Sequence, residues 1–155
     1  MANTLDLSRN EAEKILALTK ECPESAFNNT GHGKQSYPLM SVGIIVNGEY
    51  KRSLTVELMC RMTARPNRTS VKFTIFKMEH GIRKRVYQLD VFIPPVCTIG
   101  SHNWPHEHIG HDREFFDKNY PANFDACIEY FSKKTNISFE VKPESPFEFS
   151  LRPNK

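Results

Sequence analysis

The strongest constraint on the fold is a two-residue alternation of apolar and polar side chains that runs through residues 41–93. Leu54, Val56 and Leu58 share one face of a predicted strand, while Thr55 points to the other face. Successive side chains of a strand point to opposite sides, so this pattern is typical of an antiparallel sheet with one buried face and one wet face.

Turn residues divide this region into strands. Asn-Gly between two alternating segments is the strongest short signal for a hairpin, and it occurs at Asn47-Gly48. We therefore predict a β-meander over residues 37–93, with hairpins near Asn47-Gly48, Pro66-Asn67 and His80-Gly81. Pro94-Pro95 follows the fourth strand and ends it.

Helical patterns flank the meander on both sides. Ser8-Arg9-Asn10-Glu11 has the form of a capping box, and Pro23 ends the predicted first helix. The chain of 155 residues is thus predicted to be one α+β domain, a four- to five-stranded antiparallel β-meander packed with an N-terminal and a C-terminal helix. Its predicted parts are a helix at 8–22, the meander at 37–93, a histidine-rich loop at 96–120, a helix at 121–135 and terminal strands at 137–152.

The sequence also bears on compartment and cofactors. No apolar run has the length of a membrane span, and the N-terminus lacks the pattern of a secretory signal. The four cysteines contain no C-x-x-C pair, so we expect reduced, mostly buried thiols in a cytoplasmic protein without a membrane partner. No glycine-rich phosphate loop is present, and no cofactor is expected.

Positive charge is concentrated in the middle of the chain. The whole chain carries +3, whereas residues 49–92 hold ten basic and four acidic residues and carry +6. This asymmetry favours a polyanionic partner, either RNA or a nucleoprotein complex. The candidate nucleic-acid-binding residues are Arg61, Arg65, Arg68, Arg83, Lys84 and Arg85. A solvated sheet face whose edges are protected by basic residues explains the same pattern equally well.

Four of the six histidines lie within residues 101–112. Three explanations are open for this cluster: a metal site, an acid–base site, or a polar loop that packs on Trp104 and Pro105. A catalytic zinc site needs about three ligands, and the loop has enough imidazoles. The spacing does not match H-E-x-x-H, because His106 and His108 are only two residues apart. We therefore assign no metal ligands, although a metal-stabilised interaction module stays open.

The acid–base explanation makes His106, His108 and His111 the candidate catalytic residues. Proton transfer to and from a phosphodiester needs one neutral and one charged imidazole near neutral pH. Glu107 and Asp112 are expected to raise the pKa of one imidazole. Arg113 and the basic strands are expected to lower the pKa of another. Trp104 or Tyr120 would then stack on a base.

The segments YQLDVF at 87–92 and PHEHIGH at 105–111, with the order of elements from 42 to about 135, resemble the TumE-like toxins of bacterial toxin–antitoxin modules. The resemblance implies a toxin-like fold from a mobile element or defence region, with His106, His108 and His111 as candidate functional residues and a cognate antitoxin as a candidate partner. Gln88-Leu89-Asp90 departs from the family's R-[YW]-D approach to the loop, and the N-terminal helix is additional. The function predicted is therefore a toxin-like protein acting on RNA, as a metal-independent ribonuclease if it is an enzyme. The alternative is a non-enzymatic phage or mobile-element inhibitor of the anti-defence type, which binds a nucleoprotein partner through its basic surface.

Overall fold

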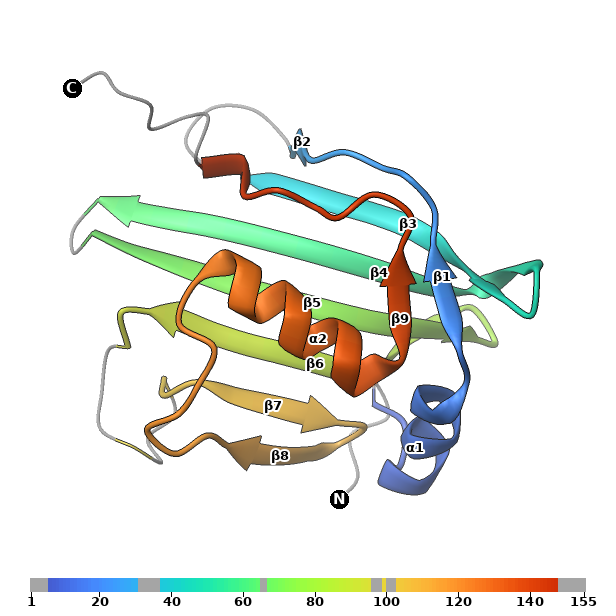
Figure 1. The fold of residues 1–155 in the computed structure, drawn as a ribbon. Coiled ribbons are helices and arrows are strands. Elements are labelled where there is room, and N and C mark those ends of the chain that lie inside the picture. The colour runs from blue at the N-terminus through green and yellow to red at the C-terminus, as the bar shows by residue number, and fades with distance from the viewer. Residues whose placement is uncertain (1–5, 31–36, 65–66, 96–98, 100–102, 148–155) are drawn as a thin grey trace.

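The structure is a computed structural model that describes residues 6–30, 37–64, 67–95, 99 and 103–147. Within these residues, one nine-stranded sheet packs against two helices (Figure 1). The strand order is β8-β7-β6-β5-β4-β3-β1-β9, and β2 pairs with β3 beside this path. The elements in chain order are α1 (Arg9–Ala17), β1 (Lys20–Cys22), β2 (Asn28–Asn29), β3 (Pro38–Val46), β4 (Glu49–Ala64), β5 (Asn67–Glu79), β6 (Ile82–Ile93), β7 (His106–Ile109), β8 (Asp112–Phe115), α2 (Phe124–Thr135) and β9 (Ile137–Phe139).

The predicted α+β class and the antiparallel meander are confirmed. Strands β3 to β6 pair with their chain neighbours in antiparallel order. Asn47 and Gly48 have φ of 53° and 77°, and His80 and Gly81 have 52° and 78°, as a two-residue turn with two left-handed positions requires. At the hairpin predicted near Pro66-Asn67, Ala64 pairs with Asn67, while Pro66 lies outside the described residues. The sheet itself is larger than the four to five strands predicted.

The first helix is shorter than predicted, and the last three residues of the predicted range form a strand instead. The capping box is present, with Glu11 N–H donating to Ser8 Oγ at 3.2 Å. The helix ends at Ala17, not at residue 22, and Leu18 is extended at φ −72° and ψ 139°. Strand β1 then pairs antiparallel with β3 and parallel with β9. Lys20 and Cys22 are buried on the same face of β1. The buried positions at the end of the predicted helix therefore follow the two-residue period of a strand and not the period of a helix.

Lys20 explains why the chain leaves the helix where it does. Its side chain is fully buried, and Nζ donates to the carbonyl oxygens of Leu16, Leu18 and Thr135 at 3.2, 2.7 and 2.6 Å. Burial lowers the pKa of Lys20 to about 8. The last carbonyl groups of a helix lack intrahelical partners, and this one amine satisfies carbonyl groups at the C-terminal ends of both α1 and α2.

The predicted histidine-rich loop at 96–120 contains a β-hairpin, which corrects that assignment. Strand β7 extends the sheet beyond β6, and β8 pairs with β7 at the edge. The segment did not resemble a strand in the sequence because a core-facing position of β7 holds the polar residue Glu107, which is 6% exposed. Residues 96–98 and 100–102 lie outside the described part of the chain.

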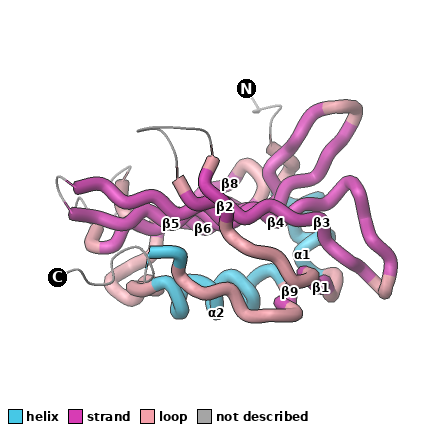
Figure 2. Tube along the Cα trace, turned by 90° about the horizontal axis from the view of Figure 1, so that it is seen from above, coloured by secondary structure: helices cyan, strands magenta, loops and turns pink. Residues whose placement is uncertain are grey.

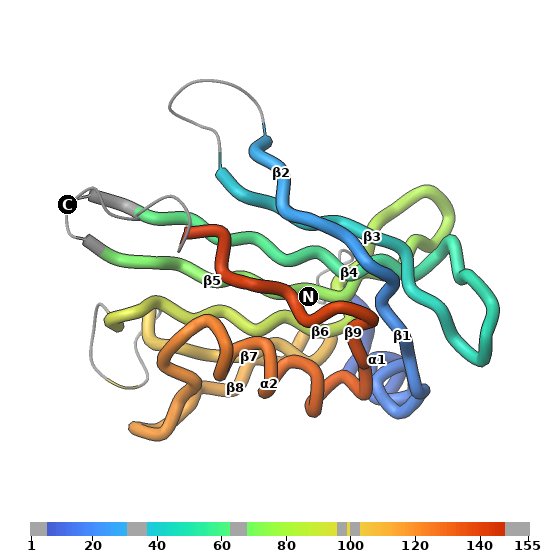
Figure 3. The backbone as a smooth tube through the Cα atoms, turned by 45° about the horizontal axis from the view of Figure 1, so that its top comes forward, coloured from blue at the N-terminus to red at the C-terminus, as the bar shows by residue number. Residues whose placement is uncertain are grey.

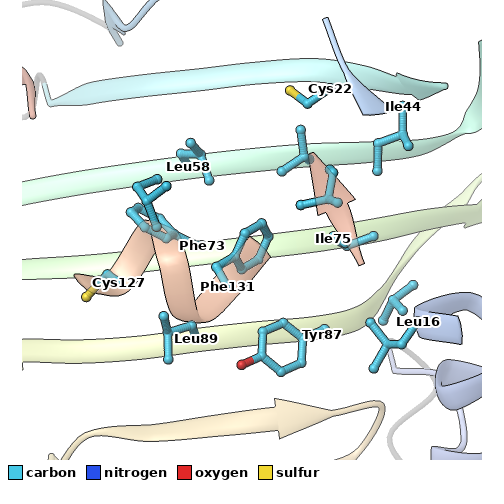
Figure 4. Close-up of a cluster of buried hydrophobic side chains, with 14 of the residues drawn as sticks. Leu16, Cys22, Ile44, Leu58, Phe73, Ile75, Tyr87, Leu89, Cys127 and Phe131 are labelled. Atoms are coloured by element: carbon cyan, nitrogen blue, oxygen red, sulfur yellow. The ribbon is translucent and has the colours of Figure 1, made fainter. Parts of the chain in front are cut away.

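Helix α2 covers one face of the sheet, as Figure 2 shows in the edge-on view. It begins three residues later than predicted, after Asn123 caps Ala126 N–H at 2.8 Å, and it ends as predicted at Thr135. Phe131 packs edge-on against Phe73 with ring centroids 5.7 Å apart, and its ring lies 5.9 Å from that of Tyr87 (Figure 4). These aromatic rings lie among the buried residues of β4, β5 and β6.

The C-terminal part of the chain is only partly described. The predicted strand after the second helix is confirmed over Ile137–Phe139, where it runs parallel to β1. Residues 140–147 then return alongside residues 22–29 (Figure 3), and Glu140 N–H donates to the Cys22 carbonyl at 2.9 Å. Residues 140–147, which were predicted to continue the terminal strands, are not strand, and residues 148–152 lie outside the described residues.

Two further sequence-based predictions can be compared with the described residues. Cys22, Cys60 and Cys127 are buried free thiols, and burial raises the pKa of each to about 12. Cys97 lies outside the described residues. Neither α1 nor α2 has the length and apolar character needed to cross a bilayer.

We predict that Lys20→Met lowers the free energy of unfolding by about 2–4 kcal/mol, because the Leu18 and Thr135 carbonyl groups lose their side-chain donor, whereas the Leu16 carbonyl keeps a second donor in Asn136 Nδ2. Lys14→Met is the matched control, since Lys14 is an exposed lysine of α1. Urea denaturation followed by circular dichroism measures both variants. Equal midpoints for the two variants would show that the buried amine contributes nothing.

Candidate functional site

The face of the sheet opposite α2 is polar, and we call its β4–β8 part the outer face. Leu58, Phe73 and Leu89 point to the helix side, so their neighbours along each strand point to the outer face. The outer face includes Thr55, Glu57, Met59, Arg61, Ser70, Lys72, Thr74, Phe76, Arg85, Gln88, Asp90, Phe92, His106, His108, Arg113 and Phe115. The α2 helix packs on the other side of the sheet (Figure 2).

Strand β7 brings two of the three candidate histidines together on this face. His106 pairs with Asp90 of β6 and with Phe115 of β8, and His108 pairs with Gln88 and Arg113. The two imidazole rings are edge to face, with centroids 5.0 Å apart. A spacing of two residues, which argued against a helical metal motif, is the spacing that places both rings on one face of a strand.

His106 is held on both sides by acceptors. It is 4% exposed, with Nδ1 2.8 Å from the Trp104 carbonyl oxygen and Nε2 3.5 Å from a carboxylate oxygen of Asp90. Nδ1–H therefore donates to the Trp104 carbonyl, and Nε2 faces the Asp90 carboxylate. With both nitrogens engaged and the ring buried, His106 is placed to orient the site and is poorly placed to contact a ligand.

His108 is half-buried and lies among cations. Desolvation is the largest of the effects that lower its pKa to about 3, followed by Arg85, His106, Arg113 and Lys72. The imidazole is therefore neutral at neutral pH. This is the direction expected from Arg113 and the basic strands, and it leaves His108 as a neutral hydrogen-bonding group within a positive environment.

Glu107 does not act on these histidines, contrary to the expectation from the sequence. Its carboxylate points to the helix side of the sheet, where it accepts hydrogen bonds from Tyr87 at 2.6 Å and Tyr130 at 2.9 Å. Lys134 Nζ lies 3.9 Å away. Burial, and after it the charge of the Glu107 carboxylate, raises the pKa of both phenols. Strand alternation separates Glu107 from its sequence neighbours, so it fastens β7 to α2.

The third candidate, His111, lies apart from the pair. It is exposed in the turn between β7 and β8, where Nδ1 is 3.1 Å from a carboxylate oxygen of Asp112. His102 lies outside the described residues. Among the residues that the structure describes, no three His, Cys, Asp or Glu side chains are grouped so that they could hold a metal ion.

Most of the predicted nucleic-acid-binding residues are engaged within the protein. Arg83 lies 3.9 Å above the Phe76 ring and 3.2 Å from a Glu57 oxygen. Lys84 pairs with Glu79 at 3.2 Å. These contacts place carboxylates beside the cations of the β5–β6 hairpin, which reduces the charge available to a polyanion.

The other predicted cations differ among themselves. Arg85 is half-buried and donates to Asp6 at 2.8 Å and to Gln88 at 3.0 Å. Arg68 Nε donates to the Pro94 carbonyl at 2.7 Å. Arg61 is exposed and lies 5.5 Å from the Tyr37 ring centroid. Arg65 lies outside the described residues.

Three outer-face cations remain without an acidic partner. Within the described parts of the chain, Arg61, Lys72 and Arg113 have no carboxylate at ion-pair distance. Lys72 and Arg113 belong to β5 and β8 and act on His108 from both sides. The sequence-based binding set omitted both residues. For Lys72 the period-two pattern was a usable signal, since it places this residue on the wet face.

Trp104 and Tyr120, which were predicted to stack on a nucleobase, are already packed within the protein. Trp104 and Tyr120 pack edge-on against each other with centroids 5.5 Å apart, and the indole N–H donates to the Phe116 carbonyl at 2.8 Å.

A pocket of about 460 Å³ lies elsewhere, between residues 25–29 and 141–146. Phe27, which lines it, packs against α2, so this pocket belongs to the helix side.

Comparison of the chain with protein-family models, with curated proteins and with solved structures finds no match in any of the three. The resemblance to TumE-like toxins therefore stays a prediction, and the function is argued from the outer face alone.

We predict that the stability of the protein falls as the pH drops from 6.5 toward 3. His108 has a pKa near 6.5 in the unfolded chain and about 3 in the fold, so the unfolded chain takes up a proton in this window and the fold does not. His108→Gln cannot be protonated, and its loss of stability should be smaller by on the order of 1–3 kcal/mol. His111→Gln is the control. Identical pH dependence of urea unfolding in wild type and His108→Gln would contradict the assignment.

Proposed function

We propose that this protein acts on RNA through its outer face, with His108, Lys72 and Arg113 as the phosphate site. One observation carries the proposal, namely a neutral, partly accessible imidazole that pairs across the β7–β8 hairpin with Arg113 and lies in the field of Lys72. Neither cation has a carboxylate at ion-pair distance within the described residues. A phosphate at this position gains two charge-assisted contacts, and its charge in turn favours protonation of His108.

The same residues support a chemical step without a metal. A neutral His108 accepts the proton of a ribose 2′-hydroxyl while the 2′-oxygen attacks phosphorus. The bond to the 5′-oxygen breaks, and that oxygen takes a proton from solvent. Lys72 and Arg113 stabilise the charge that develops on the phosphoryl oxygens. In this scheme His106 and Asp90 orient His108, which is the general base. A toxin of this kind would be restrained by a cognate antitoxin that covers the outer face.

The second candidate is a binding protein without catalysis, such as a phage or mobile-element inhibitor of a nucleoprotein complex. The observation that favours it is the state of His106, whose two ring nitrogens already face Trp104 and Asp90. Only His108 of the pair is then available for proton transfer. Cleavage that uses a separate acid and base needs two accessible groups, whereas binding needs neither.

We predict a shallow salt dependence for RNA binding. Single-stranded RNA releases about 0.7 counterion per neutralised phosphate, so Arg61, Lys72 and Arg113 give a slope of about −2 in log K against log salt. The six cations predicted from the sequence would give about −4. Fluorescence anisotropy of a labelled single-stranded RNA measures this slope. A slope near zero would remove the outer face as an RNA site.

We predict that Lys72→Gln and Arg113→Gln each weaken RNA binding several-fold, because each removes one phosphate contact. Lys133→Gln is the matched control, since Lys133 is exposed on α2 on the opposite side of the sheet. If all three variants bind alike, the phosphate site is not here.

We predict that His108→Gln retains RNA binding within a few-fold and loses RNA cleavage, which is read as new fragments on a denaturing gel in the presence of a chelator. The glutamine keeps a polar group of similar size but cannot accept the proton. Wild-type protein that binds RNA and leaves it intact would favour the inhibitor. Cleavage that persists in His108→Gln would exclude His108 as the base.

A further inference from the structure

We infer that the ligand of the outer face is single-stranded RNA, and that one of its bases stacks on Phe115 beside the phosphate site. The inference rests on the proposed function and adds a second contact to it. It explains an aromatic residue of the edge strand that the phosphate chemistry does not use.

Phe115 is placed next to the phosphate site by the register of β8. It is 38% exposed and pairs with His106, whose ring centroid is 5.5 Å away. Arg113 is two residues earlier on the same face, with its guanidinium carbon 5.3 Å from the Phe115 centroid. Residues two apart on a strand are about 7 Å apart, which is within the reach of one nucleotide from its phosphate to its base.

Phe115 is exposed, whereas Phe76, Trp104 and Tyr120 are only partly exposed. Arg83 covers the Phe76 ring at 3.9 Å and is itself held by Glu57. Trp104 and Tyr120 are packed on each other. Phe115 is the last residue of the four-residue edge strand β8, whose other residues are polar, and its ring is exposed to solvent. Packing in the core therefore does not account for an aromatic residue at this position. Stacking on a base would bury its open surface.

The chemistry of the site also separates single strands from duplexes. The faces of paired bases are stacked on their neighbours and cannot reach an aromatic side chain, whereas unpaired bases can be splayed out. Charge complementarity comes from Lys72 and Arg113, which lack acidic partners within the described chain. An anion without bases would engage these cations alone.

The test compares three probes by fluorescence or competition anisotropy: a single-stranded RNA, the same RNA annealed to its complement, and inorganic polyphosphate. We expect Phe115→Leu to weaken binding of the single strand about tenfold and to leave polyphosphate binding unchanged. Phe115→Tyr keeps the ring and should keep the affinity. Tyr50→Leu is the control, because Tyr50 is an exposed aromatic residue, 61% exposed, at the start of β4.

The outcomes separate this inference from the proposed function. If Phe115→Leu binds the single strand as tightly as Phe115→Tyr and wild type, or if the duplex binds as tightly as the single strand, the stacking contact is overturned. The phosphate site survives that result as long as Lys72→Gln still weakens binding of RNA and polyphosphate. If Lys72→Gln and Arg113→Gln change neither, the proposed function fails. Equal melting temperatures of the two Phe115 variants show that the comparison is between folded proteins.

Discussion

The contact of Phe131 with Phe73 and Tyr87 determines the rest of the architecture. It presses α2 onto the middle strands of the sheet and so decides which of the two faces is buried (Figure 4). Because side chains alternate along a strand, choosing one face for the core assigns every other side chain of β4, β5 and β6 to the opposite face. The polar outer face is therefore a direct consequence of the core.

Strand β7 extends this logic to the candidate site. Its three polar residues His106, Glu107 and His108 are adjacent in sequence and act on different sides of the sheet. Glu107 joins β7 to the helix layer through Tyr87 and Tyr130, and the flanking histidines then point outward. The position of both imidazoles thus depends on a carboxylate that never contacts them. A buried carboxylate is tolerated here because two phenols donate to it.

Charge on this protein has to be counted locally. The segment 49–92 carries +6, but its cations at Arg83, Lys84 and Arg85 are neutralised by Glu57, Glu79 and Asp6. What remains on the outer face is a few cations around His108. A small positive site with a neutral imidazole is suited to about three phosphates rather than to a long polyanion, since each phosphate contact needs its own cation.

The sequence by itself determined the class of the fold, because the meander, its Asn47-Gly48 and His80-Gly81 turns and the capping box at Ser8 are local patterns of side-chain period and turn chemistry. It also identified His106 and His108 as candidate site residues. Only the tertiary structure decided that residues 20–22 and 106–115 are strands, since Lys20 and Glu107 occupy buried positions and are satisfied by partners far away in sequence. It likewise decided which cations are paired, where His111 lies, and that Phe115 rather than Trp104 is open beside the site. Those outcomes depend on contacts between distant segments, and a periodic pattern contains no information about such partners.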